Sequence, residues 1–100
     1  MPIASPRYAF TAVMVSGAPP DPGVYALWRG EELIYYGRAL GGEATIQSSL
    51  RAHLEGRGAG CTAGATHYGW EISAHPRQRE AELLREYQKS NGRLPRCNAG

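Results

Sequence analysis

The sequence predicts one small α+β domain in which a three-stranded sheet, antiparallel or mixed, is flanked by helices in a sandwich-like arrangement. Residues 24–28, 33–36 and 68–72 form short apolar runs bounded by glycine, proline or polar residues, as β-strands do. Residues 46–54 and 77–89 repeat apolar side chains at helical spacing. One hundred residues suffice for one hydrophobic core and leave no room for a second.

The composition is that of an ordinary globular chain. Hydrophobic residues make up 42% and charged residues 20%, which excludes a disordered polyelectrolyte. The net charge is only +2, so any affinity for nucleic acid must come from the placement of cations. Every cation except Lys89 is an arginine. Arginine suits bidentate contacts with phosphate, and a GC-rich genome would give the same bias.

Cysteine content and hydropathy favour a cytoplasmic protein with no membrane partner. Cys61 and Cys97 are far apart and lack a CxxC pattern, so we expect free thiols in a reducing compartment. A zinc site that adds His53 and His67 would have no known ligand spacing and is not favoured. Residues 1–7 lack the apolar core of a signal peptide. No run approaches the ~20 apolar residues of a membrane span.

The motif-bearing core is expected to cover residues 22–98, and the part of the chain before it is expected to be an extension of that core. Residues 8–15 are apolar and partly β-branched, so an edge strand is possible there. Residues 16–23 are dense in glycine and proline and must form a loop. Residues 1–21 are therefore interpreted as an N-terminal extension of a single domain.

The two strands at 24–28 and 33–36 are expected to form a β-hairpin, because residues 29–32 read as a polar turn. If the turn is centred near Gly30, Tyr25 lies opposite Tyr35. Both phenols would then project from one face of the sheet.

The first predicted helix carries Ile46, Leu50 and Leu54 at every fourth position, with Arg51 and His53 flanking that stripe. The glycine-rich residues 56–64 end the helix and are expected to form an exposed loop.

The second predicted helix follows the break at His75-Pro76 and covers residues 77–89. Its expected buried side consists of Ala81, Leu83, Leu84 and Tyr87. Glu80 lies on this apolar side, where a carboxylate needs a partner such as an arginine or a metal ion.

Four short motifs occur along the chain in a fixed order. Gly23-Val24-Tyr25 and Tyr35-Tyr36-Gly37 are separated by nine residues, and Arg38 follows directly. Glu80-Ala81-Glu82-Leu83-Leu84 lies on the second helix, and Pro95-Arg96-Cys97-Asn98 lies in the tail. This ordered set resembles the GIY-YIG nuclease superfamily, with its E-x-x-L-I helix and closing P-x-x-N. The resemblance covers about residues 22–98 and implies a fold of GIY-YIG type.

The resemblance implies a metal-dependent endonuclease that hydrolyses DNA phosphodiester bonds. Glu80 would bind one Mg²⁺ or Mn²⁺, which would neutralise the phosphate and assist departure of the 3′ oxygen. A tyrosine would act as general base. We favour Tyr25 for this role, with Tyr35 orienting phosphate or water.

The resemblance also implies roles for neighbouring polar residues. Arg38 and Arg51 would clamp the phosphate, and they or the metal ion would lower the pKa of the phenol. His53 would relay the proton. Asn98 would tie the tail near the site and contact nucleic acid.

One departure leaves a second interpretation open. The family has an arginine on the first helix where this chain has Ser49, so Arg51 either replaces it or the activity is lost. A nucleic-acid-binding module without turnover is therefore the alternative, and a scaffold for a protein partner is a third. Because so small a domain offers little surface for reading bases, specificity would come from a partner protein or a homodimer.

Overall fold

The computed structural model describes residues 2–56 and 60–98. Its elements, in chain order, are β1 (Tyr8–Ala9), α1 (Ala12–Val15), β2 (Gly23–Arg29), β3 (Glu32–Ala39), α2 (Ile46–Leu54), the 3₁₀ helix η1 (Gly60–Gly64), β4 (His67–Ile72) and α3 (Pro76–Asn91).

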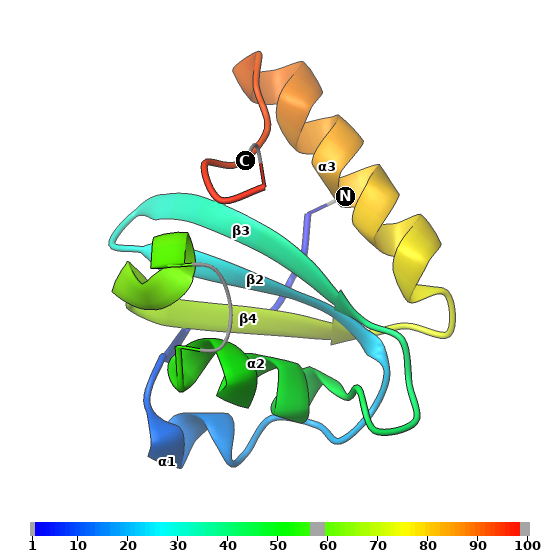
Figure 1. Ribbon diagram of the computed structural model, residues 1–100. Coiled ribbons are helices and arrows are strands. Elements are labelled where there is room, and N and C mark those ends of the chain that lie inside the picture. The colour runs from blue at the N-terminus through cyan, green and yellow to red at the C-terminus, as the bar shows by residue number, and fades with distance from the viewer. Residues whose placement is uncertain (1, 57–59, 99–100) are drawn as a thin grey trace.

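The strands form one four-stranded antiparallel sheet in the order β1-β4-β2-β3. Figure 1 shows β4, β2 and β3 side by side. The predicted α+β class and the antiparallel pairing are confirmed. The predicted count of three strands was wrong, because the two-residue β1 pairs with the edge of β4. β3 forms the opposite edge of the sheet.

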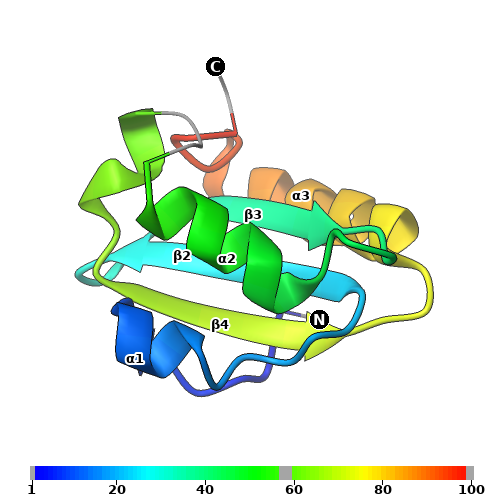
Figure 2. The ribbon, with the colours of Figure 1, turned by 60° about the horizontal axis from the view of Figure 1, so that its bottom comes forward.

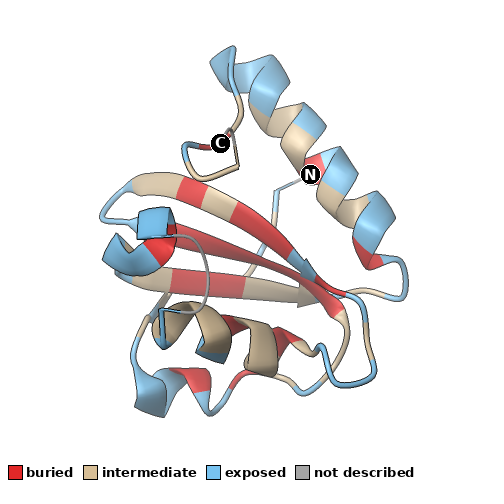
Figure 3. Cartoon of the chain, in the orientation of Figure 1, coloured by how far each residue is buried: buried red, intermediate tan, exposed pale blue. Residues whose placement is uncertain are grey.

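Helices cover both faces of the sheet: α1 and α2 lie on one face and α3 on the other (Figure 2). Alternate residues of β2 therefore enter two different cores. Tyr25 and Leu27 pack with Ile46 and Leu50 of α2. The residues that alternate with them along β2 pack against α3, and these are Val24, Ala26 and Trp28. This explains why β2 is buried along nearly all its length in Figure 3. The expected apolar stripe of the first helix is confirmed at Ile46 and Leu50.

The segment before Gly23 contributes to the same core. Val15 and Ala18 are buried against the α2 face of the sheet. The possible strand over residues 8–15 is correct only for Tyr8–Ala9. Beyond it, the Thr11 hydroxyl accepts the N–H of Met14 and caps α1, so the chain turns into a helix.

Helix α2 begins with a reciprocal cap. The Thr45 hydroxyl accepts the N–H of Ser48, and the Ser48 hydroxyl accepts the N–H of Thr45. The loop conformation predicted over residues 56–64 was wrong for residues 60–64, although all of these except Thr62 are exposed, as expected. Residues 60–64 form η1, whose Thr62 is only 1% exposed. Residues 57–59 lie outside the described part of the chain.

Helix α3 extends slightly beyond its predicted bounds of 77–89. It begins at Pro76, whose missing N–H is tolerated in a first turn, and ends at Gly92 in the left-handed region. Leu83 is buried and Tyr87 half-buried, as expected. Ala81 is exposed, which corrects its predicted place on the buried side.

The C-terminal tail is fastened to the free edge of β3. The N–H of Cys97 donates to the Ile34 carbonyl at 2.8 Å. The Asn98 side chain accepts the N–H of Tyr36 and donates to the Tyr36 carbonyl, each at 2.9 Å. Asn98 thus takes the place of a neighbouring strand, in agreement with its predicted role of tying down the tail.

Cys61 and Cys97 form a disulfide, so the prediction of two free thiols was wrong. The fold brings η1 and the tail together with a Cα–Cα distance of 5.6 Å, although 36 positions separate the cysteines along the chain. Within residues 2–56 and 60–98, no helix has the length and apolar character needed to cross a membrane.

Candidate active site

Tyr25 and Tyr35 project from the same face of the β2–β3 hairpin, but they are not directly opposite. Tyr25 pairs with Gly37, and Leu27 pairs with Tyr35. The expected pairing was therefore wrong by two residues. Because side chains alternate with a period of two, the predicted common face is preserved. The two rings lie 6.1 Å apart between centroids.

A β-bulge decides which tyrosine of β3 joins Tyr25. Next to the turn, Trp28 pairs with Leu33, but Leu27 pairs with Tyr35, so Ile34 has no partner in the register. Without this extra residue, continued pairing would place Tyr36 opposite Tyr25. The bulge shifts the rest of β3 by one residue and turns Tyr35 toward α2.

Gly37 provides the space in which the Tyr25 phenol lies. A Cβ atom at this position would come within 2.3 Å of Cζ and 2.4 Å of the hydroxyl oxygen of Tyr25. A side chain here would have to displace the ring. The glycine of Tyr35-Tyr36-Gly37 is thus explained by the tyrosine of Gly23-Val24-Tyr25 on the neighbouring strand.

His53 of α2 contacts both phenol rings. Its Nε2 lies 3.0 Å from the Tyr25 hydroxyl. Its ring centroid is 5.7 Å from that of Tyr25 and 5.2 Å from that of Tyr35. Nδ1 of His53 lies 3.0 Å from the hydroxyl of Thr62 in η1. Both ring nitrogens therefore have a hydroxyl neighbour.

Arg38 and Glu80 form an ion pair between β3 and α3. Nη1 of Arg38 donates to Oε1 of Glu80 at 2.6 Å. The Glu80 side chain is 13% exposed and that of Arg38 is 43% exposed. The partner expected for a carboxylate on the apolar side of α3 is therefore an arginine. This ion pair joins β3 to α3, whereas the phenols face α2, and the Glu80 charge raises the pKa of both phenols.

Burial keeps the phenols protonated. It raises the pKa of Tyr25 far above its ordinary value, and the neighbouring Tyr35 phenol and the Glu80 carboxylate raise it further. Burial and then Glu80 raise the pKa of Tyr35 in the same direction. Arg38 lowers both values but is outweighed. The expectation of a lowered tyrosine pKa was therefore wrong in this state of the protein.

Burial lowers the pKa of His53, so its imidazole is neutral at neutral pH. A neutral imidazole carries one bare nitrogen that accepts a proton. The pair of Tyr25 and His53 is thus a protonated phenol beside a neutral base.

The other two predicted residues lie apart from this cluster. Arg51 is exposed, two residues before His53 and so about 200° around the helix from it. No hydrogen bond or ion pair joins it to the cluster in the described part of the chain. Asn98 bonds to the main chain of Tyr36, and its contact with nucleic acid stays a prediction.

The donor set is compatible with a single hydrated divalent ion. Within the described ranges, no three His, Cys, Asp or Glu side chains are grouped closely enough to hold a metal. Mg²⁺ commonly uses one or two carboxylates and keeps several waters. Glu80 offers one such carboxylate, in which Oε1 bonds to Arg38. Oε2 makes no hydrogen bond or ion pair within the residues described.

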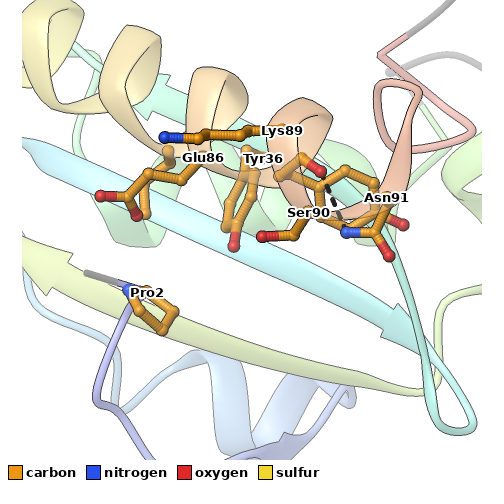
Figure 4. Close-up of a pocket in the computed structure, with 8 residues that line it drawn as sticks. Pro2, Tyr36, Glu86, Lys89, Ser90 and Asn91 are labelled. Atoms are coloured by element: carbon orange, nitrogen blue, oxygen red, sulfur yellow. Dashed lines mark hydrogen bonds between the residues drawn. The ribbon is translucent and has the colours of Figure 1, made fainter.

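A separate hollow lies on the opposite face of the sheet. It has a volume of about 410 Å³ and is lined by Pro2, Tyr36 and residues of the second half of α3 (Figure 4). None of the predicted site residues lines it. Burial raises the pKa of Tyr36 here, so this phenol is also protonated at neutral pH.

Sequence reasoning missed Thr62 and the structural roles of Ile34 and Gly37. Thr62 stands in a glycine-rich run whose pattern indicates a loop, so nothing in the sequence signals its burial. The bulged Ile34 is contacted by the tail, which is distant along the chain. Comparison with known proteins adds no relative: no family model, curated protein or solved structure matches this chain.

Replacing Gly37 by alanine should displace the Tyr25 phenol. The added Cβ overlaps the ring, so we expect a loss of about 1–3 kcal/mol in the free energy of unfolding, together with a shifted His53 ring resonance. Urea unfolding and NMR measure the two effects. Gly60→Ala is the control, because its Cβ would meet nothing within 4 Å. A Gly37→Ala protein that matches the wild type in both measurements contradicts this packing.

The buried phenols should make the fold sensitive to alkali. Tyr25, Tyr35, Tyr36 and Tyr68 have raised pKa values, chiefly from burial. The unfolded chain releases these protons from about pH 10 whereas the folded chain keeps them, so stability falls as pH rises above that value. Near-ultraviolet titration of the folded protein should show that these four phenols ionise only above the ordinary range near pH ~10. The Tyr25→Phe variant should show one such phenol fewer. Simultaneous ionisation of all tyrosines near pH ~10 in the folded state would contradict the prediction.

Proposed function

We propose that this protein is a metal-dependent endonuclease that hydrolyses DNA phosphodiester bonds, as its resemblance to the GIY-YIG superfamily implies. One observation carries the proposal. Two phenols and an imidazole from β2, β3 and α2 contact one another, and an ion pair between β3 and α3 acts electrostatically on both phenols, because its Glu80 charge raises their pKa. These groups are distant along the chain, and neither sheet nor helix geometry alone requires these contacts.

The phenol–imidazole pair offers a route for the proton of an attacking water. Tyr25 is poorly suited to exist as a free phenolate, because burial raises its pKa. In the proposed step, Tyr25 takes a proton from water while its own proton passes to Nε2 of His53, 3.0 Å away. Tyr35, the more exposed of the two phenols, orients the water.

Arg38 and Glu80 would act on the phosphate side of the reaction. The bond to Glu80 uses one N–H of the guanidinium, and the side chain is 43% exposed, so further N–H donors are available to a phosphate oxygen. Glu80 would hold a hydrated Mg²⁺ or Mn²⁺, which when bound supplies charge neutralisation on the phosphate and assistance to the leaving 3′ oxygen.

Removing the Glu80 carboxylate should abolish cleavage without abolishing DNA binding. We expect Glu80→Ala to lower the rate by about 100-fold or more, because a bound metal ion contributes several kcal/mol to transition-state stabilisation. The assay uses branched, nicked and linear DNA with Mg²⁺ or Mn²⁺. Glu82→Ala removes the same charge from the same helix, where Glu82 pairs with Arg79, and should cleave like the wild type. Undiminished cleavage by Glu80→Ala would refute the mechanism.

A DNA-binding module without turnover is the second candidate, and three observations favour it. Ser49 stands where the resemblance expects an arginine, and Arg51 lies on another side of α2 from His53. Tyr25 is also only 4% exposed, which restricts the access of water to its hydroxyl. This candidate predicts salt-dependent DNA binding with no cleavage under any divalent ion.

Arg51→Ala separates the two candidates. If Arg51 swings to the phosphate in the complex, the variant should lose cleavage by about 100-fold, as removal of one transition-state donor does. If Arg51 only contacts the DNA backbone, the variant should bind more weakly and with a smaller salt dependence. Cleavage rates and binding isotherms over a salt series measure both. Arg85→Ala, an exposed arginine of α3, is the charge-matched control.

A further inference from the structure

Thr62 is the polar residue of η1 that the proposed chemistry does not yet use. It is 1% exposed, and its hydroxyl lies 3.0 Å from Nδ1 of His53. The Tyr25 hydroxyl lies at the same distance from Nε2 on the other side of the ring. The imidazole is therefore held between two hydroxyl groups from different elements.

The position of the ring proton depends on this arrangement. A neutral imidazole has one N–H donor and one bare acceptor nitrogen, whereas a hydroxyl can donate or accept. Under the function proposed above, Nε2 must be bare to receive the proton of Tyr25. The ring proton must then lie on Nδ1, and Thr62 must accept it. A valine at position 62 would fill the same volume but could not accept.

The disulfide links Thr62 to the strand that carries Tyr35. Cys61 precedes Thr62 and is bonded to Cys97, whose N–H donates to the carbonyl of the bulged Ile34. η1 is a 3₁₀ helix of five residues that contacts α2 through Thr62. The disulfide adds a covalent link to the tail, which is hydrogen-bonded to β3.

We propose that Thr62 is a positioning residue that holds His53 with its proton on Nδ1, leaving Nε2 to accept the proton of Tyr25, and that the Cys61–Cys97 disulfide keeps Thr62 in place. Reduction by a dithiol would transfer two electrons and two protons to the disulfide. The S–S bond breaks, Cys61 and Cys97 become thiols, and the dithiol becomes a disulfide. η1 then loses its covalent link to the tail.

Nitrogen NMR of the His53 ring in DNA-free protein tests the positioning role. In the wild type at neutral pH, Nδ1 should show the shift of a protonated ring nitrogen and Nε2 that of a bare one. Thr62→Ser keeps the hydroxyl and should retain this pattern, whereas Thr62→Val should lose it. The opposite tautomer in the wild type, or an unchanged pattern in folded Thr62→Val, overturns the inference. If Thr62→Val does not fold, the ring-nitrogen patterns of the wild type and of Thr62→Ser still test the inference.

The same spectra test the disulfide. Reduced wild-type protein should lose the fixed pattern and resemble Thr62→Val. The Cys61→Ser/Cys97→Ser double variant should show that altered pattern with or without dithiol. A reduced wild type that keeps the oxidised pattern refutes the role of the disulfide.

Cleavage assays distinguish this inference from the proposed function. If both hold, Thr62→Val should lower kcat by about 10–100-fold, as loss of a supporting hydrogen bond commonly does, and Thr62→Ser should restore it. The predicted tautomer with no cleavage by the wild type would sink the nuclease and leave the positioning role intact. Cleavage by a protein with the opposite tautomer would sink the positioning role and the proton transfer to Nε2, but not the nuclease activity itself.

Discussion

The candidate site depends on a single irregularity in β3, the unpaired Ile34. A regular ladder would turn Tyr35 away from Tyr25 and put Tyr36 in its place. The bulge exposes an Ile34 carbonyl at the edge of the sheet, and the tail satisfies it through the N–H of Cys97. Asn98 bonds to Tyr36, two residues further along the strand, so the tail covers this edge in the register that brings the two phenols together.

The electrostatics of the site favour proton transfer within a hydrogen-bonded pair over a free anionic base. Burial acts in opposite directions on the two members, raising the pKa of the Tyr25 phenol and lowering that of His53. Both effects favour the neutral forms. A phosphate held by Arg38 would draw that guanidinium from Glu80, and the carboxylate would then be open to a cation. The resting ion pair is thus compatible with a substrate-dependent rearrangement.

Much of the fold could be predicted from short-range patterns. The hairpin, the stripe of Ile46 and Leu50, and the start of α3 at Pro76 follow from periodicity and from residues that begin or end helices. The candidate residues Tyr25, Tyr35, Arg38 and Glu80 could be selected because their motifs have an ordered spacing, and His53 because it flanks the apolar stripe of the first helix. The packing of the short helix α1 and the burial of Thr62 could not be predicted, because both involve contacts with α2, which is distant along the chain or lies across a glycine-rich segment.

The sequence by itself determined the α+β class, the common face of the two phenols and the need of Glu80 for a partner, because these follow from side-chain periodicity and from the cost of burying a charge. Only the tertiary structure decided that the partner is Arg38, that Tyr25 pairs with Gly37 and that Cys61 and Cys97 are bonded. Each of these contacts joins residues that are distant along the chain or depends on one unpaired residue. Local propensity carries no information about contacts between distant residues or about which residue of a strand is left unpaired.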